Sequence, residues 1–234
     1  MILARSLAYA SLFYLFTAIC ALAMLPLLLA PRRFMRAATL LWIAGTIQLL
    51  RGVCGLRVEI RGRDKIPAGA ALIAAKHECM FDTMAPFAAL PDAAYVLRRT
   101  LLKIPFYGWY CRKTGMIPVD RAGGAQALRA LVAAAKEKAA QGRQVVIFPE
   151  GTRTPDLTAP YKPGVAALYR DLALPCTPLA TNSGRFWPAH GFIRRPGLIV
   201  YEFLDPIPSG LHRAEFMRRL RERIETASAA LREG

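Results

Sequence analysis

The first segment with side chains that could do chemistry is KHECMFD at residues 76–82, where His77 stands five residues before Asp82. Imidazole is the usual general base near neutral pH, and it needs a partner on its second nitrogen to fix the tautomer and stabilise the imidazolium. Asp82 can be that partner, so Cys79 is expected only to fill space. No serine or cysteine is placed as an obvious nucleophile, which favours direct attack by a substrate hydroxyl.

The second segment is FPEGTR at residues 148–153, which combines groups suited to binding an anion. Gly151 lets the backbone approach a ligand closely, and Arg153 can bind phosphate through two parallel hydrogen bonds. Glu150 could hold that arginine or accept a hydrogen bond from a substrate hydroxyl. A base with an orienting acid, together with an anion clamp, is what acyl transfer onto a phosphate-bearing alcohol requires.

The two segments differ in how specific they are. A histidine and an aspartate at this spacing occur together by chance in many proteins, as a half-buried histidine and a helix-capping aspartate. The hexapeptide is much more specific, because a strand-ending turn with a surface ion pair does not account for all six residues. The functional interpretation therefore depends on the presence of both segments.

Both segments follow short apolar runs, at residues 70–75 and 145–148, which predict buried strands. Five residues along one helix separate two side chains by roughly 140°. His77 is therefore expected in the turn after the first strand, and Asp82 in the first turn of the next helix. Backbone N–H groups at the start of that helix are candidates to stabilise an oxyanion.

The rest of the chain alternates short apolar strands with helical patterns, which predicts an α/β fold with a mixed sheet flanked by helices. The clearest helices are expected at residues 125–140 and 211–231. A hairpin or strand pair is expected at residues 192–203, around the Pro-Gly pair at 196–197.

In this order, the two segments resemble the lysophospholipid acyltransferase family, and most closely its bacterial 1-acyl-glycerol-3-phosphate acyltransferases. The resemblance runs from about residue 58 to about residue 208 and includes LKIPFYGW at 102–109, GMIPVDR at 115–121, YKPG at 161–164 and LPCTPL at 174–179. The chain departs from the family pattern at Lys76, where Asn is frequent, and at Arg98, where Lys is frequent. Both departures preserve polarity or charge.

The resemblance implies a glycerolphosphate acyltransferase-like fold and the transfer of a fatty acyl group to the sn-2 hydroxyl of lysophosphatidic acid, which makes phosphatidic acid in phospholipid biosynthesis. It implies that His77 is the general base and that Asp82 orients it. The donor would be a thioester of coenzyme A or of acyl carrier protein, with no metal or redox cofactor. The residues expected to bind the substrate phosphate are Arg98, Arg121, Glu150, Gly151, Thr152 and Arg153.

Two other functions remain open at this point. The first is the same chemistry on a different acceptor, such as a lyso-ornithine lipid or another lysophospholipid. The second is a non-enzymatic, basic protein that binds membranes or nucleic acid, which would explain the charge but would leave the two segments as a coincidence.

The chain has 32 Lys and Arg against 16 Asp and Glu, a net charge of +16 that suggests a polyanionic partner. No nucleic-acid-binding motif is recognisable and the N-terminus is hydrophobic, so anionic phospholipids or an acidic acyl carrier fit better than nucleic acid. Candidate basic clusters are Arg32-Arg33, Arg98-Arg99, Arg194-Arg195 and Arg218-Arg219. The five scattered cysteines lack a C-x-x-C pair, which argues against a disulfide framework or a zinc site and is consistent with a reducing cytoplasm.

The N-terminal region predicts a membrane element. Residues 6–30 carry no charge and are long enough to span a bilayer, whereas the uncharged run at 37–50 is short for a span and suits a re-entrant or interfacial helix. We therefore expect a two-helix membrane anchor at residues 1–52 and a catalytic domain at 53–234, on the cytoplasmic side of a bacterial inner membrane. A cleaved signal peptide is the rival, although its apolar region is usually shorter.

Overall fold

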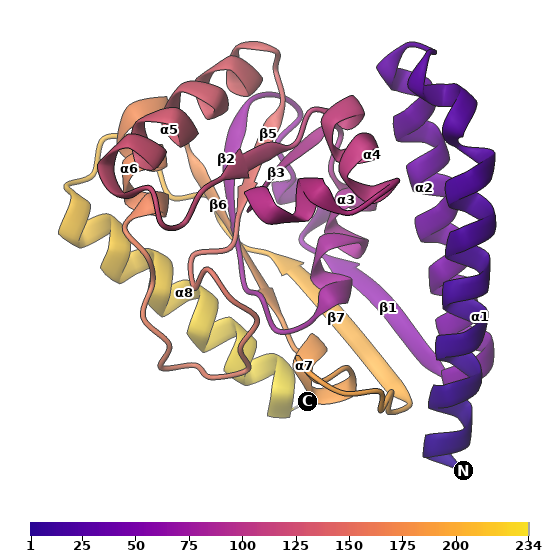
Figure 1. The fold of residues 1–234 in the computed structure, drawn as a ribbon. Helices are drawn as coiled ribbons and strands as arrows, with labels where there is room; N and C mark the ends of the chain where they lie inside the picture. Colours follow the sequence, from indigo (N-terminus) through magenta and orange to yellow (C-terminus); the bar gives the residue numbers. More distant parts are fainter. Residues whose placement is uncertain (234) are drawn as a thin grey trace.

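The computed structural model describes residues 1–233, which form a seven-stranded mixed sheet with helices packed against it (Figure 1). The strand order is β1-β7-β6-β2-β5-β3-β4, and every neighbouring pair is parallel except β6 and β7. The predicted mixed α/β fold is therefore confirmed. The strands are β1 (Leu56–Arg61), β2 (Ala71–Ala75), β3 (Ala93–Arg98), β4 (Ile117–Val119), β5 (Gln144–Ile147), β6 (Cys176–Thr181) and β7 (Gly197–Phe203).

Helices cover both faces of the sheet. Successive side chains of a strand point to opposite faces, so a strand whose side chains are all apolar needs cover on both sides. On β2, Leu72 and Ala74 pack in a core with helices α5, α6 and α8, whereas Ile73 and Ala75 pack in a second core that includes α3 and the N-terminal helices. The helices are α1 (Ile2–Ala23), α2 (Arg32–Leu49), α3 (Ala85–Ala89), α4 (Tyr107–Thr114), α5 (Gly124–Ala140), α6 (Gly164–Leu172), α7 (Ser183–Phe186) and α8 (Arg213–Glu233). Helices α5 and α8 match the two predicted helices to within two residues at each end.

The hairpin expected at residues 192–203 is wrong. Only β7 forms there, and it pairs in parallel with β1 and antiparallel with β6, which are distant in the chain. The residues before Gly197 form a loop whose polar groups bond outside the sheet. The N–H of Arg194 donates to the hydroxyl of Ser6 at 2.8 Å. The guanidinium of Arg194 lies over the ring of Trp187, 3.9 Å from its centroid.

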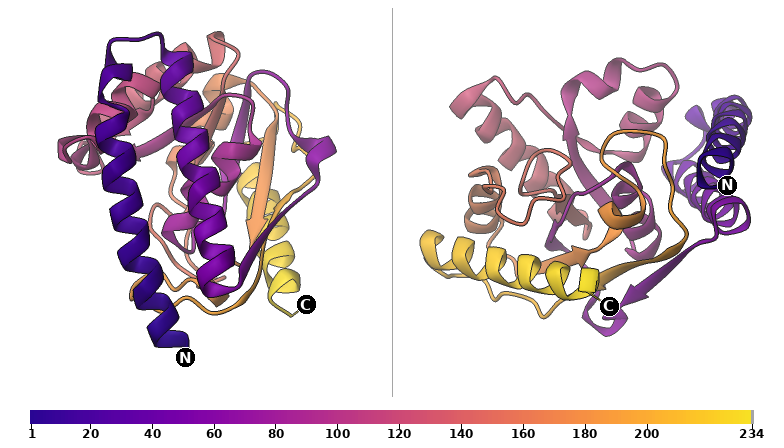
Figure 2. Two further views of the ribbon diagram at one scale, coloured as in Figure 1. Left: turned by 90° about the vertical axis from the view of Figure 1, so that its right-hand side faces the viewer. Right: turned by 90° about the horizontal axis from the view of Figure 1, so that it is seen from below.

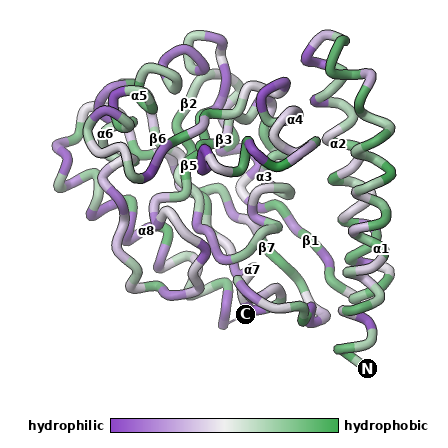
Figure 3. The backbone as a smooth tube through the Cα atoms, in the orientation of Figure 1, coloured by the Kyte–Doolittle hydropathy of each residue, from purple (hydrophilic) through white to green (hydrophobic). Residues whose placement is uncertain are grey.

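Helices α1 and α2 lie side by side along one flank of the sheet domain (Figures 1 and 2). Figure 3 shows them as predominantly hydrophobic. The helix that begins at Arg32 continues through a π-helical turn at Leu50–Cys54 and reaches 23 residues. By length and composition, both it and α1 could cross a membrane. The helix is longer than the uncharged run at 37–50 predicted, because it also includes the three arginines of its first turns and the π-helical turn at its end. Whether it spans a membrane or lies at its surface stays a prediction.

The two N-terminal helices also pack on the rest of the molecule. One hydrophobic core contains Tyr9, Phe13 and Ile43 together with Phe81 and Trp187. The boundary proposed at residue 52 lies inside the π-helical turn, and Cys54 and Leu56 continue the same core. Arg32 also forms a bidentate ion pair with Asp92, at 2.8 and 2.5 Å. Large apolar side chains of both helices remain open to solvent, with Leu15 of α1 60% and Leu41 of α2 74% exposed.

Candidate active site

His77 lies in the turn that follows β2, and Asp82 lies in the 3₁₀ turn Met80–Thr83 that leads into α3. The order of strand, turn and helix agrees with the prediction. The turn brings His77 Nδ1 to 3.2 Å from Asp82 Oδ2. The imidazole is 14% exposed, whereas the carboxylate is 1% exposed. The ring of Phe148, from the second segment, stacks on the imidazole with centroids 3.9 Å apart, so the two segments meet at His77.

Five further groups donate to the Asp82 carboxylate. Oδ2 accepts the backbone N–H groups of Glu78 and Cys79, at 2.6 and 2.8 Å. Oδ1 accepts the hydroxyls of Ser183 and Tyr201 at 2.6 and 2.9 Å, and the thiol of Cys79 lies 3.4 Å away. Ser183 and Tyr201 lie 101 and 119 residues away in the chain, and no pattern near the first segment indicated them.

These contacts determine the charge of Asp82. Burial by itself raises the pKa of this carboxyl, but the hydrogen bond and charge of His77, with the donors from Cys79 and Ser183, hold its pKa below the usual range. An ionised Asp82 retains the proton on His77 Nδ1, and this leaves Nε2 as the nitrogen that can act as a base. Burial and the neighbouring Asp82 raise the pKa of Cys79 well above its usual value, so this thiol is a poor nucleophile.

The structure does not support the oxyanion donors expected at the start of the helix. The N–H groups of Glu78 and Cys79 are the first two after His77, and both already donate to Asp82 Oδ2. An N–H that is bonded to an ionised carboxylate is not free to bind a second anion. This expectation was therefore wrong for these two groups.

The second segment follows β5, which pairs in parallel with β2. The carboxyl ends of neighbouring parallel strands open at the same edge of a sheet, which is where ligands bind in open α/β folds. The N–H of Thr154 donates to the carbonyl of His77 at 2.7 Å and joins the two segments directly. Gly151 has a φ of +70°, a left-handed conformation that favours glycine, so it has a structural role in this turn.

Glu150 lies in a different environment from the one expected. Its carboxylate is buried and faces Lys76, whose Nζ is 3.2 Å from Glu150 Oε1. Burial outweighs the attraction of Lys76 and raises the pKa of Glu150 to about 7. Among residues 1–233, this carboxylate forms an ion pair with Lys76 and none with Arg153. The structure therefore does not show the expected contact of Glu150 with Arg153, and a contact of Glu150 with a substrate hydroxyl stays a prediction.

Arg98 and Arg121 line one cavity of about 500 Å³. Arg98 ends β3 and pairs in register with Val119 of β4, so the following turn places Arg121 nearby. Arg121 is exposed overall, but partial loss of water around its guanidinium and the charge of Arg98 lower its pKa. The cavity is also lined by Arg99 and Lys103, which we did not predict as site residues although the Arg98-Arg99 pair marked the region as basic.

The cations of this cavity have no acidic partner within the part of the chain that the structure describes. Among residues 1–233, none of Arg98, Arg99, Lys103 and Arg121 forms an ion pair, although Asp120 also lines the cavity. Arg153 and Thr152 are exposed in the loop after β5 and are not part of the cavity lining. The structure thus groups two of the three predicted arginines and places the third on a separate loop.

Several members of the other basic clusters are engaged within the chain. Arg32 pairs with Asp92, Arg194 stacks on Trp187, and Arg218 and Arg219 pair with Glu215. These side chains are less free to bind a polyanion than the sequence suggested. Among residues 1–233, no three His, Cys, Asp or Glu side chains form a group that would hold a metal ion.

Known proteins resemble this chain in sequence. Residues 57–182 match the Acyltransferase family model. The chain is 36% identical over 159 residues to 1-acyl-sn-glycerol-3-phosphate acyltransferase of Pseudomonas aeruginosa, a match that covers 68% of this chain and 62% of that protein. It is 32% identical over 145 residues to the protein of the same name from Helicobacter pylori, a match that covers 59% of this chain and 61% of that protein. The matches thus span about three fifths of these two relatives.

The fold also resembles a solved structure. The crystal structure of the 1-acyl-sn-glycerophosphate (LPA) acyltransferase PlsC from Thermotoga maritima superposes with a TM-score of 0.78 and 21% identity. The superposition covers 99% of this chain and 98% of that one. At this identity the likeness concerns the fold, and it includes the two N-terminal helices because nearly the whole chain is covered.

Proposed function

The chain belongs to the acyltransferase family, and we propose that it transfers a fatty acyl group from an acyl thioester to the free sn-2 hydroxyl of 1-acyl-glycerol-3-phosphate. The product is phosphatidic acid for phospholipid biosynthesis. The observation that carries this proposal is the pairing of His77 and Asp82 at the same sheet edge as the cavity lined by Arg98 and Arg121. The names of the bacterial relatives support the choice of acceptor.

In the proposed reaction, His77 Nε2 removes the proton of the acceptor hydroxyl while its oxygen attacks the carbonyl carbon of the thioester. The carbon–sulfur bond then breaks, the thiolate leaves, and the imidazolium returns its proton to that sulfur. Asp82 stays ionised throughout, because its hydrogen bonds keep its pKa low, and it stabilises the imidazolium through Nδ1–H. The step needs no further reactant.

We assign the acceptor phosphate to the cavity lined by Arg98 and Arg121, with Arg99 and Lys103 as additional cations. A phosphate monoester brings close to two negative charges at neutral pH, which would relieve the repulsion between these guanidinium groups. The loop after β5 carries the other predicted phosphate-binding residues, Gly151, Thr152 and Arg153. We propose that the guanidinium of Arg153 also binds the acceptor phosphate.

We propose that residues 1–52 anchor the protein in the bacterial inner membrane, with the catalytic region 53–234 at its cytoplasmic surface. The open apolar face of α1 and α2 would lie in lipid, which would let the acyl chains of both substrates remain there during transfer. Such an anchor resists high salt, because apolar burial does not depend on charge screening. Release of the full chain from membranes by salt alone would argue against the anchor.

The test is an assay of the purified full chain against a panel of lyso-lipids, each with acyl-coenzyme A and with acyl carrier protein as donor. We expect transfer to lysophosphatidic acid, and loss of that transfer in a folded His77→Ala variant. Preference for a lysophospholipid without a terminal phosphate, or for a lyso-ornithine lipid, would reassign the acceptor. No transfer to any lyso-lipid would contradict an enzymatic function.

A further inference from the structure

The C-terminal helix α8 binds the residues on both sides of His77, although it lies outside the stretch that matches the family. On one side, Lys76 is fully buried, and its Nζ lies 2.8 Å from Glu225 Oε2. On the other side, the buried carboxylate of Glu78 forms an ion pair with Arg232. The second oxygen of Glu78 accepts the N–H of Gly184 at 2.6 Å, so this carboxylate is fully engaged.

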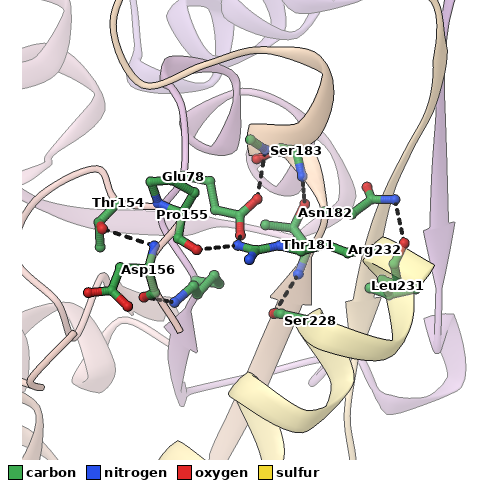
Figure 4. A network of polar contacts seen from close by, with 12 residues as sticks. Glu78, Thr154, Pro155, Asp156, Thr181, Asn182, Ser183, Ser228, Leu231 and Arg232 are labelled. Atoms are coloured by element: carbon green, nitrogen blue, oxygen red, sulfur yellow. Dashed lines mark hydrogen bonds and ion pairs between the residues drawn. The ribbon is translucent and has the colours of Figure 1, made fainter. Parts of the chain in front are cut away.

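The same helix holds the loop that follows the second segment. Arg232 donates to the carbonyl of Pro155 at 2.7 Å, and Tyr161 donates to Glu225 Oε1 at 2.8 Å. Lys76 also donates to the carbonyl of Asp156 at 3.1 Å. Figure 4 shows the end of α8 reaching Glu78 and this loop at once through Arg232.

These two sets of contacts converge on His77, because the N–H of Thr154 in the loop donates to the His77 carbonyl. Buried charges cost free energy unless they are paired. Lys76 has a second acidic neighbour in Glu150, but α8 supplies its shortest ion pair, through Glu225, and supplies the ion pair of Glu78, through Arg232. The helix is itself fixed by an apolar stripe of Phe216, Leu220 and Ile224 in the core of the sheet domain. A rigid element thus holds the backbone on either side of the proposed base.

We propose that Glu225 and Arg232 are positioning residues that set the geometry of His77 and of the loop after Arg153. The catalytic part of this inference rests on the proposed function, whereas its structural part does not. Loss of the Arg232 contacts would let the loop and the His77 turn move against each other without disturbing the strands that carry them. Small displacements of a reacting group are costly for catalysis.

The first experiment needs no activity. Amide hydrogen exchange is measured in Arg232→Gln and in the control Arg218→Gln. The control removes an exposed arginine of the same helix that, among residues 1–233, pairs with Glu215 and Glu222. We expect the Thr154 amide to exchange about tenfold faster in Arg232→Gln only, with β5 unchanged, because local opening is cheaper than global unfolding. Unchanged exchange at Thr154, or an equal rise in β5, would overturn the positioning role.

The second experiment measures kinetics in the same variants and in Glu225→Gln. We expect the kcat of Arg232→Gln and of Glu225→Gln to fall about tenfold while the KM of the acyl donor changes little, because the reacting groups are misaligned but still present. Arg232→Lys restores one charged contact and should recover part of the rate. An equal loss in Arg218→Gln, or an unchanged kcat in both network variants, would contradict the proposal. An inactive wild-type chain would instead contradict the proposed function, and the exchange result would still stand.

Discussion

The His77 turn and the basic cavity lie at one edge of the sheet, yet they are built in opposite ways. Around the turn, Asp82 is buried and accepts hydrogen bonds from five groups besides the contact with His77. In the cavity, Arg98 and Arg121 are exposed, and each lacks an acidic partner among residues 1–233. One region satisfies its polar groups internally, whereas the other leaves them free.

This difference follows from the chemistry proposed for each region. A general base must hold one tautomer in one place, which requires a fixed and fully bonded neighbour. A phosphate site must instead attract an anion, and unpaired cations that repel each other provide the attraction when the anion arrives. Changes in the turn should therefore alter kcat and stability, and changes in the cavity should alter acceptor binding.

The largest expected effect is on turnover. His77→Ala should lower kcat by about 10²–10⁴-fold, the usual contribution of a general base, with little change in acceptor KM. The fold should survive because the imidazole contributes one hydrogen bond to Asp82 and one ring contact. Steady-state kinetics and thermal unfolding of the same preparation check both points. Near-normal turnover in a folded variant would remove His77 from the reaction.

Arg121→Ala should act on binding. Loss of a charged hydrogen bond to phosphate is worth about 1.5–3 kcal/mol, so kcat/KM for the acceptor should fall by about 10- to 150-fold while the donor KM hardly changes. Arg153→Ala should show a smaller loss, because Arg153 is not part of the cavity lining. Arg213→Ala, an exposed arginine on α8, is the matched control. Equal changes in the kinetic constants of donor and acceptor would contradict the assignment of acceptor binding to the cavity.

Whereas His77→Ala should lower turnover alone, Asp82→Ala should lower both the free energy of unfolding and turnover. It leaves the hydroxyls of Ser183 and Tyr201 and two backbone N–H groups without their acceptor, at about 1–3 kcal/mol for each buried group that stays unpaired. Denaturant unfolding measures the difference between the two variants. Tyr201→Phe removes one donor and should cost less. An Asp82→Ala variant as stable as His77→Ala would show that these donors find other partners.

The smallest effect concerns pH and Glu150. Its pKa of about 7 in the folded protein exceeds its ordinary value of 4.5, so between these values the folded state holds a proton that the unfolded state has released. The free energy of unfolding contributed by Glu150 should therefore fall as pH rises from about 4.5 to about 7 and stay low above that. Glu150→Gln cannot titrate, so its stability relative to the wild type should be greater at pH 8 than at pH 5. Equal differences at both pH values would place the Glu150 pKa near normal.

Much of the local structure was predictable from the sequence. The apolar runs before the two segments form β2 and β5, and the periodic patterns at 125–140 and 211–231 form α5 and α8. Strand and helix periodicity are local signals, because they reflect which side chains of one segment face a core. Parallel pairing of β2 with β5 then brings the two segments together.

Tertiary structure alone decided which polar groups meet. Tyr201 binds Asp82 across 119 residues and Glu225 binds Lys76 across 149, and nothing near either acidic residue indicates the pairing. The same long-range pairing placed Glu150 on Lys76 and made residues 197–203 a strand beside β1 instead of half of a hairpin. Hydrophobic periodicity reports that a side chain is buried, but the partner of a buried charge depends on which distant segment packs against it.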